Sequence, residues 1–192
     1  MSIFTFTDKK KGFSKDMFKE ATAFLEKEAV PFAQSSLKEL AGYYLGCRPS
    51  AFSFVGNENI AASAETVCLI EDGINRLASG EPPQYITGIA PFFGYDFYVD
   101  RRVLIPRFDT EVLVEKALEY LEDGDSVLDL CSGSGCIGIT AALNRKVLLS
   151  ALDISQGAGE IFEKNCKKLL GGDAFYEKNP PKFILGDIFD SG

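Results

Sequence analysis

The stretch Ser126-Val-Leu-Asp-Leu-Cys-Ser-Gly-Ser-Gly-Cys-Ile-Gly138 decides the fold of this chain. Val127 to Leu130 form an apolar, β-prone run, and Gly133 and Gly135 then allow a tight turn and a close approach of the backbone to a ligand. The helix that follows offers unpaired N–H groups at its start. This succession of strand, glycine loop and helix predicts a binding site for a cofactor that contains a nucleoside.

A second strand, predicted over residues 147–152, leads into Asp153, which lies 18 residues after Gly135. A carboxylate at this strand end can accept hydrogen bonds from both hydroxyl groups of a ribose. A helix is expected over 156–170 and a third strand over 183–185. Strands and helices that alternate at this spacing predict a parallel sheet with right-handed crossovers.

Apolar residues recur at helical spacing in three stretches of the first 80 residues. The first is expected to start after the N-cap Ser14 and to break at Pro31. The second ends at Gly46, and the third at Gly80-Glu81-Pro82-Pro83. The positions that we expect to be buried are Phe18, Ala21, Phe24, Leu25, Leu37, Leu40, Ala41, Tyr44, Leu45, Thr66, Ile70, Ile74 and Leu77. We therefore predict a small helical bundle over residues 1–82.

Residues 83–105 carry aromatic side chains on either side of a turn signal, Gly94-Tyr95-Asp96, which predicts a β-hairpin linker. A further helix is expected to begin near Asp109 or Thr110 and to end at Gly124. Its predicted buried stripe is Val112, Leu113, Ala117 and Leu121. The third segment, residues 106–192, then holds this helix and the parallel sheet.

The composition, 46% hydrophobic and 25% charged, is that of an ordinary globular protein. We expect a cytoplasmic protein with no membrane attachment, because no run approaches the ~20 apolar residues of a bilayer span and the N-terminus has no signal-peptide core. The net charge is −8, of which residues 81–192 carry −7 (11 basic against 18 acidic residues). This acidity disfavours direct binding of nucleic acid.

The chain contains no histidine, which excludes a Ser-His-Asp triad, a Cys-His dyad and any histidine-ligated metal. Its five cysteines are odd in number and irregularly spaced, which argues against a disulfide framework. Cys131 and Cys136 are too far apart for a zinc knuckle and have no second pair, so we predict no metal site. We expect both to be small packing residues rather than nucleophiles.

The glycines at 133, 135 and 138 fit the G-x-G-x-x-G pattern of dinucleotide enzymes, so a hydride-transfer domain is one interpretation. In such a site, however, the strand end is apolar and the first glycine follows it directly. Here Asp129 occupies the strand end, and Cys131-Ser132 precede the first glycine. A carboxylate aimed into the loop repels a pyrophosphate but suits a ligand that carries an ammonium and a sulfonium. The pattern is close to the loop of class I S-adenosylmethionine methyltransferases.

Four segments extend this likeness: Glu81-Pro-Pro-Gln-Tyr-Ile-Thr-Gly88, Leu104-Ile-Pro-Arg-Phe-Asp-Thr-Glu111, Asp129-Leu-Cys-Ser-Gly-Ser-Gly135 and Gly186-Asp-Ile-Phe189. In order and spacing they resemble the HemK-type release factor glutamine methyltransferases from about residue 14 to 192. The resemblance implies an α/β chain: a helical substrate-recognition domain, a hairpin, and the first half of a Rossmann-like class I methyltransferase sheet. It also implies methyl transfer from S-adenosylmethionine to the glutamine amide in the Gly-Gly-Gln loop of a class I peptide chain release factor, the protein partner.

The resemblance also assigns individual residues to the site. It places Asp153 on the ribose, and Asp129 on the loop or on the amino group of the cofactor. It places Cys131, Ser132, Gly133, Ser134 and Gly135 around the methionine moiety, Asp187 and Ile188 at the adenine edge, and Pro106 and Arg107 at the border of the cofactor and substrate pocket. Two departures stand out: Cys131 replaces the usual glycine and Phe108 the usual proline. A side chain at 131 is expected to require a negative φ.

The catalytic element of that family is Asn-Pro-Pro-Tyr, at the end of the fourth strand. Asn179-Pro180-Pro181 differs from it, because this segment precedes the third strand and is followed by Lys182. We interpret it as a loop and predict no catalytic residue in this chain, since the motif would come after Gly192. Residues 1–192 alone are therefore expected to methylate nothing detectable and, with one side of the sheet uncovered, to associate.

Two other functions stay open. The first is a nucleic-acid amino-methyltransferase, because Asn-Pro-Pro-aromatic chemistry also serves adenine, although the acidic second half and the Ile-Pro-Arg segment argue against it. A non-catalytic module could dock a release factor through the helical domain. Asp153 could also be a simple strand-end cap, Asp187 a turn residue and Asn165 a structural residue.

Overall fold

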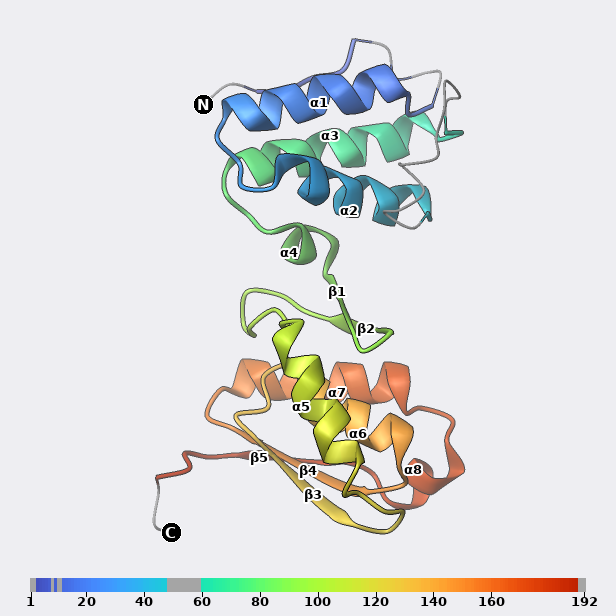
Figure 1. Cartoon of the computed structure of the whole chain (residues 1–192), viewed down its shortest axis with the longest axis vertical. Coiled ribbons are helices and arrows are strands. Elements are labelled where there is room, and N and C mark those ends of the chain that lie inside the picture. The colour runs from blue at the N-terminus through green and yellow to red at the C-terminus, as the bar shows by residue number, and fades with distance from the viewer. Residues whose placement is uncertain (1–2, 8, 10–11, 48–59, 190–192) are drawn as a thin grey trace. The chain divides into compact units, whose positions relative to one another are not determined.

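The computed structural model describes residues 3–7, 9, 12–47 and 60–189 (Figure 1). The chain divides into two compact units, Met1–Thr87 and Gly88–Gly192. The first unit is helical, and the second contains the hairpin and the parallel sheet. The hairpin that we predicted as a linker thus lies inside the second unit.

The first unit contains the three helices that the apolar spacing predicted, α1 (Lys15–Lys27), α2 (Ala33–Leu45) and α3 (Ala64–Ala78). The start of α1 is fixed by Ser14, whose hydroxyl oxygen accepts a hydrogen bond from the N–H of Met17 at 3.1 Å. The end of α2 is fixed by Gly46, which adopts a left-handed φ of +64°. The predicted helix boundaries are confirmed to within a few residues.

The core of this unit contains most of the positions that we expected to be buried. Ala21, Leu25, Leu37, Leu40, Ala41, Ile70, Ile74 and Leu77 are at most 1% exposed. Phe18, Phe24, Tyr44 and Leu45 are partly buried and pack against this core. The sequence pattern missed Phe4, Phe6 and Phe13, which precede the first helix and are all buried. Their rings meet edge to face, for example Phe4 and Phe6 with centroids 4.7 Å apart, so the N-terminal segment completes the core.

A short fourth helix, α4 (Pro83–Thr87), follows the predicted stop and was not expected. Proline suits the first position of a helix because its missing N–H would have no partner there in any case. The stop after α3 is therefore real, but Pro83 begins the next element instead of continuing a loop.

The predicted hairpin is present, with its turn in a different place. Strands β1 (Ile89–Phe92) and β2 (Tyr95–Tyr98) are antiparallel, and Phe92 pairs with Tyr95. The turn is therefore Phe93-Gly94, and the prediction of Gly94-Tyr95-Asp96 is wrong. Both turn residues have positive φ, +51° and +80°, as a two-residue hairpin turn of type I′ requires. Nothing in the sequence indicates that a phenylalanine here would adopt a left-handed backbone conformation.

The second unit contains a parallel sheet in the order β3-β4-β5, which confirms the predicted α/β architecture. Its strands are β3 (Ser126–Leu130), β4 (Leu148–Asp153) and β5 (Lys182–Leu185). Its helices are α5 (Asp109–Leu118), α6 (Cys136–Asn144), α7 (Gln156–Leu169) and α8 (Ala174–Lys178). Helix α6 connects β3 to β4, and α7 connects β4 to β5 by way of α8, a short helix that the sequence analysis did not predict.

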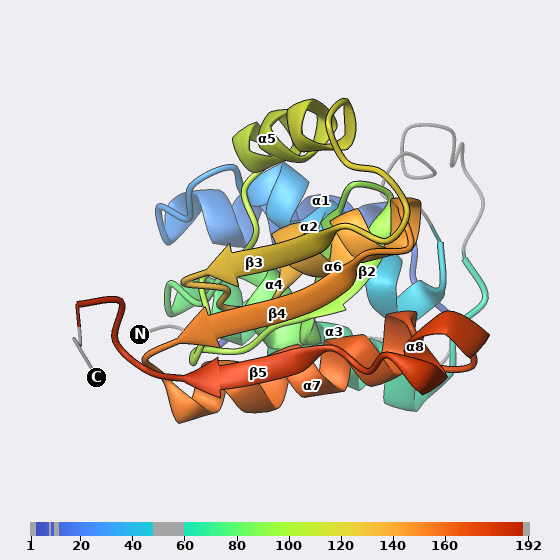
Figure 2. The same ribbon diagram turned by 90° about the horizontal axis from the view of Figure 1, so that it is seen from below.

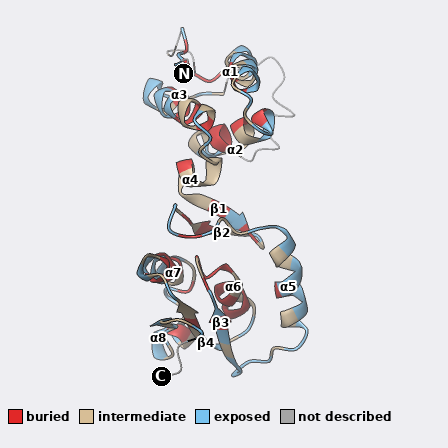
Figure 3. Cartoon of the chain, turned by 90° about the vertical axis from the view of Figure 1, so that its left-hand side faces the viewer, coloured by how far each residue is buried: buried red, intermediate tan, exposed pale blue. Residues whose placement is uncertain are grey.

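The two faces of this sheet differ in what covers them. Helices α6 and α7 lie against one face (Figure 2), where Val127, Asp129, Leu149 and Ala151 are buried or half-buried. Side chains of the opposite face are exposed, among them Leu128 (54%) and Leu130 (54%) on β3, Leu148 (43%) on β4 and Ile184 (46%) on β5. Figure 3 shows how burial is distributed over these elements. Within the described residues, β3 pairs with β4 alone.

Helix α5 packs on α6 through a narrower stripe than we predicted. Val114 is its buried residue, whereas Val112 and Leu113 are 54% and 56% exposed, so the predicted burial of these two is wrong. Ala117 and Leu121 are half-buried. A helix that packs against a single neighbouring helix buries only a narrow face, and the apolar spacing does not reveal which one.

No helix among the described residues has both the length and the apolar character that crossing a membrane would require.

Candidate functional site

The glycine loop, residues 131–135, joins the end of β3 to the start of α6. Several hydrogen bonds hold its backbone, among them those from Ser132 N–H to Leu152 O at 3.1 Å, from Gly135 N–H to Ser132 O at 2.7 Å, and from Gly133 N–H to Asp153 Oδ2 at 2.9 Å. The loop therefore lies at the carboxyl ends of β3 and β4, at the strand-to-helix junction where the sequence predicted it. This end of a parallel sheet is where α/β proteins bind ligands.

Two of the three glycines of the motif are needed for packing, and the third faces open space. A Cβ on Gly135 would lie 2.5 Å from Cδ2 of Phe162, and one on Gly138 would lie 2.7 Å from Cδ1 of Leu149. A Cβ on Gly133, which has a φ of +53°, would have no atom within 4 Å. The backbone at Gly133 is therefore the part of the loop that a ligand can approach.

Asp129 lies under the glycine loop, on the covered face of β3, and is only 6% exposed. One carboxylate oxygen, Oδ2, accepts a hydrogen bond from the N–H of Gly138 at 2.9 Å. Burial raises the pKa of Asp129, and the nearby charge of Asp153 raises it further. Across the described residues, neither carboxylate forms an ion pair with Lys or Arg. The two acids thus give the site a negative field.

Asp153, at the end of β4, is already oriented by two backbone N–H groups. Its Oδ2 accepts from Gly133 and its Oδ1 accepts from Ser155, both at 2.9 Å. Each oxygen of a carboxylate has a second lone pair, so both remain able to accept a ligand hydroxyl. The next residue, Ile154, is 70% exposed, and the sequence analysis missed it. The sequence signal that could have pointed to Ile154 is an apolar residue directly after the strand-end acid.

Cys131 adopts a left-handed φ of +58°, so the expectation of a negative φ is wrong. Its side chain is exposed, and the turn therefore keeps a glycine-like backbone without a steric clash. Such a conformation costs about 1–2 kcal/mol in a residue that carries a Cβ. The sequence cannot reveal strain that the surrounding hydrogen bonds impose.

The two serines of the loop are buried, Ser132 at 7% and Ser134 at 2% exposure. The hydroxyl oxygen of Ser132 has no hydrogen-bond partner in the described part of the chain. A buried hydroxyl without a partner costs about 1–3 kcal/mol. A bound group that hydrogen-bonds to this hydroxyl would remove that cost.

Asp187 and Ile188 follow β5, next to the end of β4. The N–H of Gly186 donates to the backbone oxygen of Asp153 at 3.0 Å, which aligns this segment with the site. Asp187 Oδ1 accepts from the N–H of Phe189 at 3.0 Å, so this acid also closes a local turn. Ile188 is 50% exposed. The structure thus places both residues at the same edge of the sheet as Asp153.

Pro106 and Arg107 lie in the extended segment before α5, and the structure joins neither of them to the glycine loop by a hydrogen bond or ion pair in its described residues. Pro106 is half-buried and Arg107 is exposed. The segment is attached to α7 by Arg102, which pairs with Asp100 at 2.7 Å and also with Glu160.

The buried thiol of Cys136 and the half-buried thiol of Cys166 are poor nucleophiles. Burial raises the pKa of Cys136 to about 11 and that of Cys166 to about 12, so neither forms a thiolate near neutral pH. The described residues contain no group of three or more His, Cys, Asp or Glu that could hold a metal ion.

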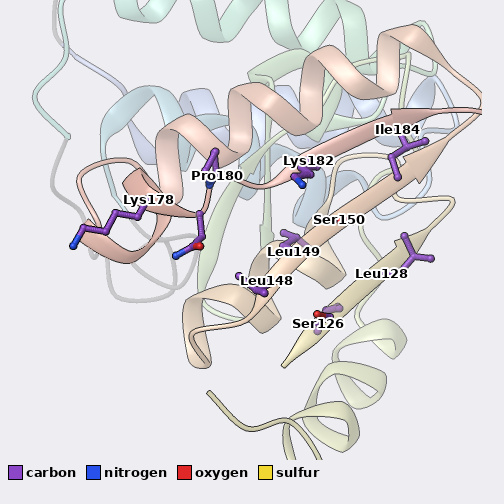
Figure 4. Close-up of a pocket in the computed structure, with 11 residues that line it drawn as sticks. Ser126, Leu128, Leu148, Leu149, Ser150, Lys178, Pro180, Lys182 and Ile184 are labelled. Atoms are coloured by element: carbon purple, nitrogen blue, oxygen red, sulfur yellow. The ribbon is translucent and has the colours of Figure 1, made fainter. Parts of the chain in front are cut away.

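A cavity of about 650 Å³ lies at the other end of the sheet, on the uncovered face (Figure 4). It is lined by the first residues of the strands, Ser126, Leu148 and Lys182, and by Asn179. None of the predicted site residues lines it. Asn179 ends α8, and its amide donates to Phe175 O at 3.1 Å, as expected of a loop residue after a helix. The Asn-Pro-Pro segment thus precedes β5, whereas Asp153 lies at the carboxyl end of β4.

Comparisons with known proteins agree with this organisation. The family described as PrmC N-terminal domain matches residues 16–88. A release factor glutamine methyltransferase from Leptospira interrogans is 35% identical over 179 residues, which are 90% of this chain and 59% of that protein. Over most of its length, this chain is similar in sequence to release factor glutamine methyltransferases.

A second release factor glutamine methyltransferase, from Borreliella burgdorferi, is 47% identical over 105 residues, 53% of this chain and 36% of the relative. The chain spans about half the length of the curated relatives it matches. Among solved structures, a Pyrococcus abyssi tRNA (uracil-54, C5)-methyltransferase in complex with S-adenosyl-L-homocysteine has a TM-score of 0.40 and 19% identity, over 52% of this chain and 23% of its own.

Proposed function

We propose that this chain binds S-adenosylmethionine at the carboxyl ends of β3, β4 and β5. The observation that carries the proposal is the pair of acids around an open glycine loop: Asp153 bound to Gly133, and Asp129 buried beneath. A sulfonium and an ammonium gain from such a field, whereas a dinucleotide would bring a pyrophosphate into it. The open space at Gly133 and the buried hydroxyl of Ser132 without a partner also fit a ligand at this place.

In this proposal each part of the site has a distinct role. The oxygens of Asp153 accept the ribose hydroxyls, and Asp129 balances the positive end of the ligand. The glycine loop surrounds the methionine moiety. Ile154, Ile188 and Asp187 border the nucleobase, since the two isoleucines offer exposed apolar surface to a flat ring. S-adenosylmethionine supplies a methyl group on a sulfonium, and the residues of the chain bind and orient it.

We further propose that the methyl group goes to a glutamine side chain of a class I peptide chain release factor. The sequence similarity to release factor glutamine methyltransferases supports this substrate. Pro106 and Arg107 would border the glutamine, and the helical unit would contact the release factor. Because release factors act on ribosomes, the reaction would take place in the cytoplasm.

Calorimetric titration with S-adenosylhomocysteine tests the cofactor site. We expect micromolar binding that Asp153→Asn weakens about tenfold or more, a loss of about 1.4 kcal/mol. Asparagine is preferable to alanine, because it can still accept the hydrogen bond from Gly133. The matched control is Asp125→Asn, which alters an exposed acid that accepts from the N–H of Glu122 before β3, and should change affinity less than twofold. Preference for a nicotinamide dinucleotide would instead support hydride transfer and reject the proposal.

Thiol labelling tests where the ligand binds, without any activity measurement. Cys131, in the glycine loop, and Cys68, in α3, are both exposed. S-adenosylhomocysteine should slow the alkylation of Cys131 and leave that of Cys68 unchanged. Equal labelling of Cys131 with and without a saturating ligand would place the binding site elsewhere.

A further inference from the structure

Asn165 is the most completely enclosed polar residue near the glycine loop. It lies in α7, is 0% exposed, and uses both ends of its side-chain amide. Its Nδ2 donates to the backbone oxygens of Ser134 at 2.9 Å and of Tyr98 at 3.0 Å. Its Oδ1 accepts from the N–H of Tyr98 at 2.7 Å. A fully hydrogen-bonded buried amide specifies one arrangement of the backbone around it.

Through these bonds Asn165 fixes one peptide plane of the glycine loop. The carbonyl of Ser134 points to Asn165, and the N–H of the same peptide, that of Gly135, donates to Ser132 O at 2.7 Å. Both the C=O and the N–H of this peptide therefore already have hydrogen-bond partners. The peptide lies next to Gly133, the position that faces open space. Rotation of this plane would change the backbone that the proposed cofactor approaches.

The same side chain holds the hairpin. Tyr98 is the last residue of β2, and its backbone N–H and C=O both hydrogen-bond to the side-chain amide of Asn165. The ring of Tyr98 also lies near two lysines of α7, Lys164 (3.8 Å to the ring centroid) and Lys168 (4.7 Å). The hairpin leads directly into the segment that contains Pro106 and Arg107.

We propose that Asn165 is a positioning residue that couples the cofactor loop to the hairpin, so that a ligand in the loop also orders β2. The proposal rests on the proposed cofactor site. Asn165 does not touch the reacting atoms; it acts through Ser134 on one side and Tyr98 on the other. Because coupling between two sites is reciprocal, loosening the hairpin must weaken ligand binding by the same factor as ligand binding tightens the hairpin.

The test compares Asn165→Ala with Tyr176→Phe. Both changes remove a buried side-chain donor shared by two backbone carbonyls, because the hydroxyl of Tyr176 donates to Ala142 O at 2.7 Å and to Arg145 O at 3.1 Å. Tyr176→Phe therefore also removes a buried donor and leaves the loop and hairpin untouched, although Asn165→Ala additionally loses the bond that Oδ1 accepts from Tyr98. We expect Asn165→Ala to weaken S-adenosylhomocysteine binding about tenfold, and Tyr176→Phe to change it less than twofold.

Hydrogen exchange measured by mass spectrometry separates positioning from general stability. In the unchanged chain, S-adenosylhomocysteine should slow exchange in residues 131–137 and also in residues 89–99. In Asn165→Ala, both segments should exchange faster without ligand, and ligand should no longer protect the hairpin. Protection of the loop without the hairpin in the unchanged chain would overturn the coupling, even if the variant failed to fold.

A failure of the proposed function gives a different result. If the unchanged chain binds no S-adenosylhomocysteine, the cofactor proposal fails. The hydrogen-exchange rates without ligand then still test whether Asn165 holds the loop and the hairpin. Faster exchange of both segments in Asn165→Ala than in Tyr176→Phe would support the link. Equal rates in the two variants would reject it.

Discussion

The two faces of the β3-β4-β5 sheet have similar apolar sequences and different surroundings. On the covered face, Leu149 is 3% exposed and Ala151 is fully buried under α6 and α7. On the opposite face, Leu128, Leu130 and Leu148 are 43–54% exposed. Apolar residues on both faces are typical of parallel strands that are covered on both sides. Hydrophobicity therefore predicts where a strand lies, but burial also depends on which elements pack against it.

Only the covered face contains an acid, and this difference concerns function. Asp129 lies between apolar residues and is hydrogen-bonded to Gly138, directly under the glycine loop. A buried carboxylate has to be stabilised by hydrogen bonds or by a nearby positive charge. The covered face thus combines the core of the unit with the base of the candidate site.

The largest expected difference between the faces is in stability. Leu149→Ala should lower the free energy of unfolding by about 2–5 kcal/mol, because it leaves a cavity under α6. Leu128→Ala, the matched change on the neighbouring strand, should cost less than about 1 kcal/mol. Urea denaturation of both variants measures this. Similar losses would mean that the second face is also covered in solution, for example by the association that we expect of this chain.

The glycines of the motif should likewise differ in their effect on stability, because one is packed against other residues and another faces open space. Gly138→Ala would force a Cβ between Leu149 and Asp129 and should cost about 1–3 kcal/mol. Gly133→Ala meets no atom, so its cost should be limited to about 1–2 kcal/mol for a left-handed alanine. Its methyl group would, however, occupy the space proposed for the cofactor. In Gly133→Ala, titration with S-adenosylhomocysteine should therefore show a loss of binding free energy that is larger than the loss of unfolding free energy.

Asp129→Asn should separate stability from binding. Because burial raises the pKa of Asp129 in the folded chain, its ionised form lowers stability at neutral pH relative to low pH. Asparagine, which can still accept from Gly138, should thus be at least as stable as aspartate at pH 7. This advantage should disappear as the pH falls below the usual aspartate value of 3.8.

The same variant should bind S-adenosylhomocysteine about tenfold more weakly, because it loses one of two negative charges. Unfolding curves between pH 3 and 8 and calorimetry check both effects. Lower stability at pH 7 together with unchanged affinity would make Asp129 a purely structural residue.

The smallest expected effect is at Cys131. Cys131→Gly should raise the free energy of unfolding by up to about 1 kcal/mol, since glycine accepts a φ of +58° without strain but is more flexible when unfolded. Cys131→Ala, which keeps the strain and removes only the thiol, should leave stability unchanged. A stabilisation by alanine as large as that by glycine would show that the thiol, and not the backbone, is unfavourable.

The parts that the sequence predicted are those that repeat or combine several local signals. Three helices with regular apolar spacing and three strands linked by helices were found where expected. The glycine loop was also placed correctly, because glycines and the strand-end acid reinforce one another. These features depend on residues close together in the chain.

The errors arose where tertiary contacts decide. The left-handed Phe93 and Cys131 are held in place by the rest of the structure, and nothing in their own side chains indicates this. The buried face of α5 depends on α6, and the sequence analysis therefore chose Val112 and Leu113 instead of Val114. Asn165 was interpreted as structural, and its contact with Ser134, 31 residues away, became visible only in three dimensions.

The hairpin has a further consequence for how the second unit opens. Two strands of four residues are marginal by themselves in water, so this element must obtain its stability from the helix on which it rests. Its detachment would expose the buried Phe92 and Phe97 and break the hydrogen bond from Phe93 N–H to Glu111 Oε1, but it would break no strand pairing of the parallel sheet and can therefore occur while that sheet remains folded. Limited proteolysis should accordingly cut near Phe93-Gly94 before it cuts inside the strands of the sheet.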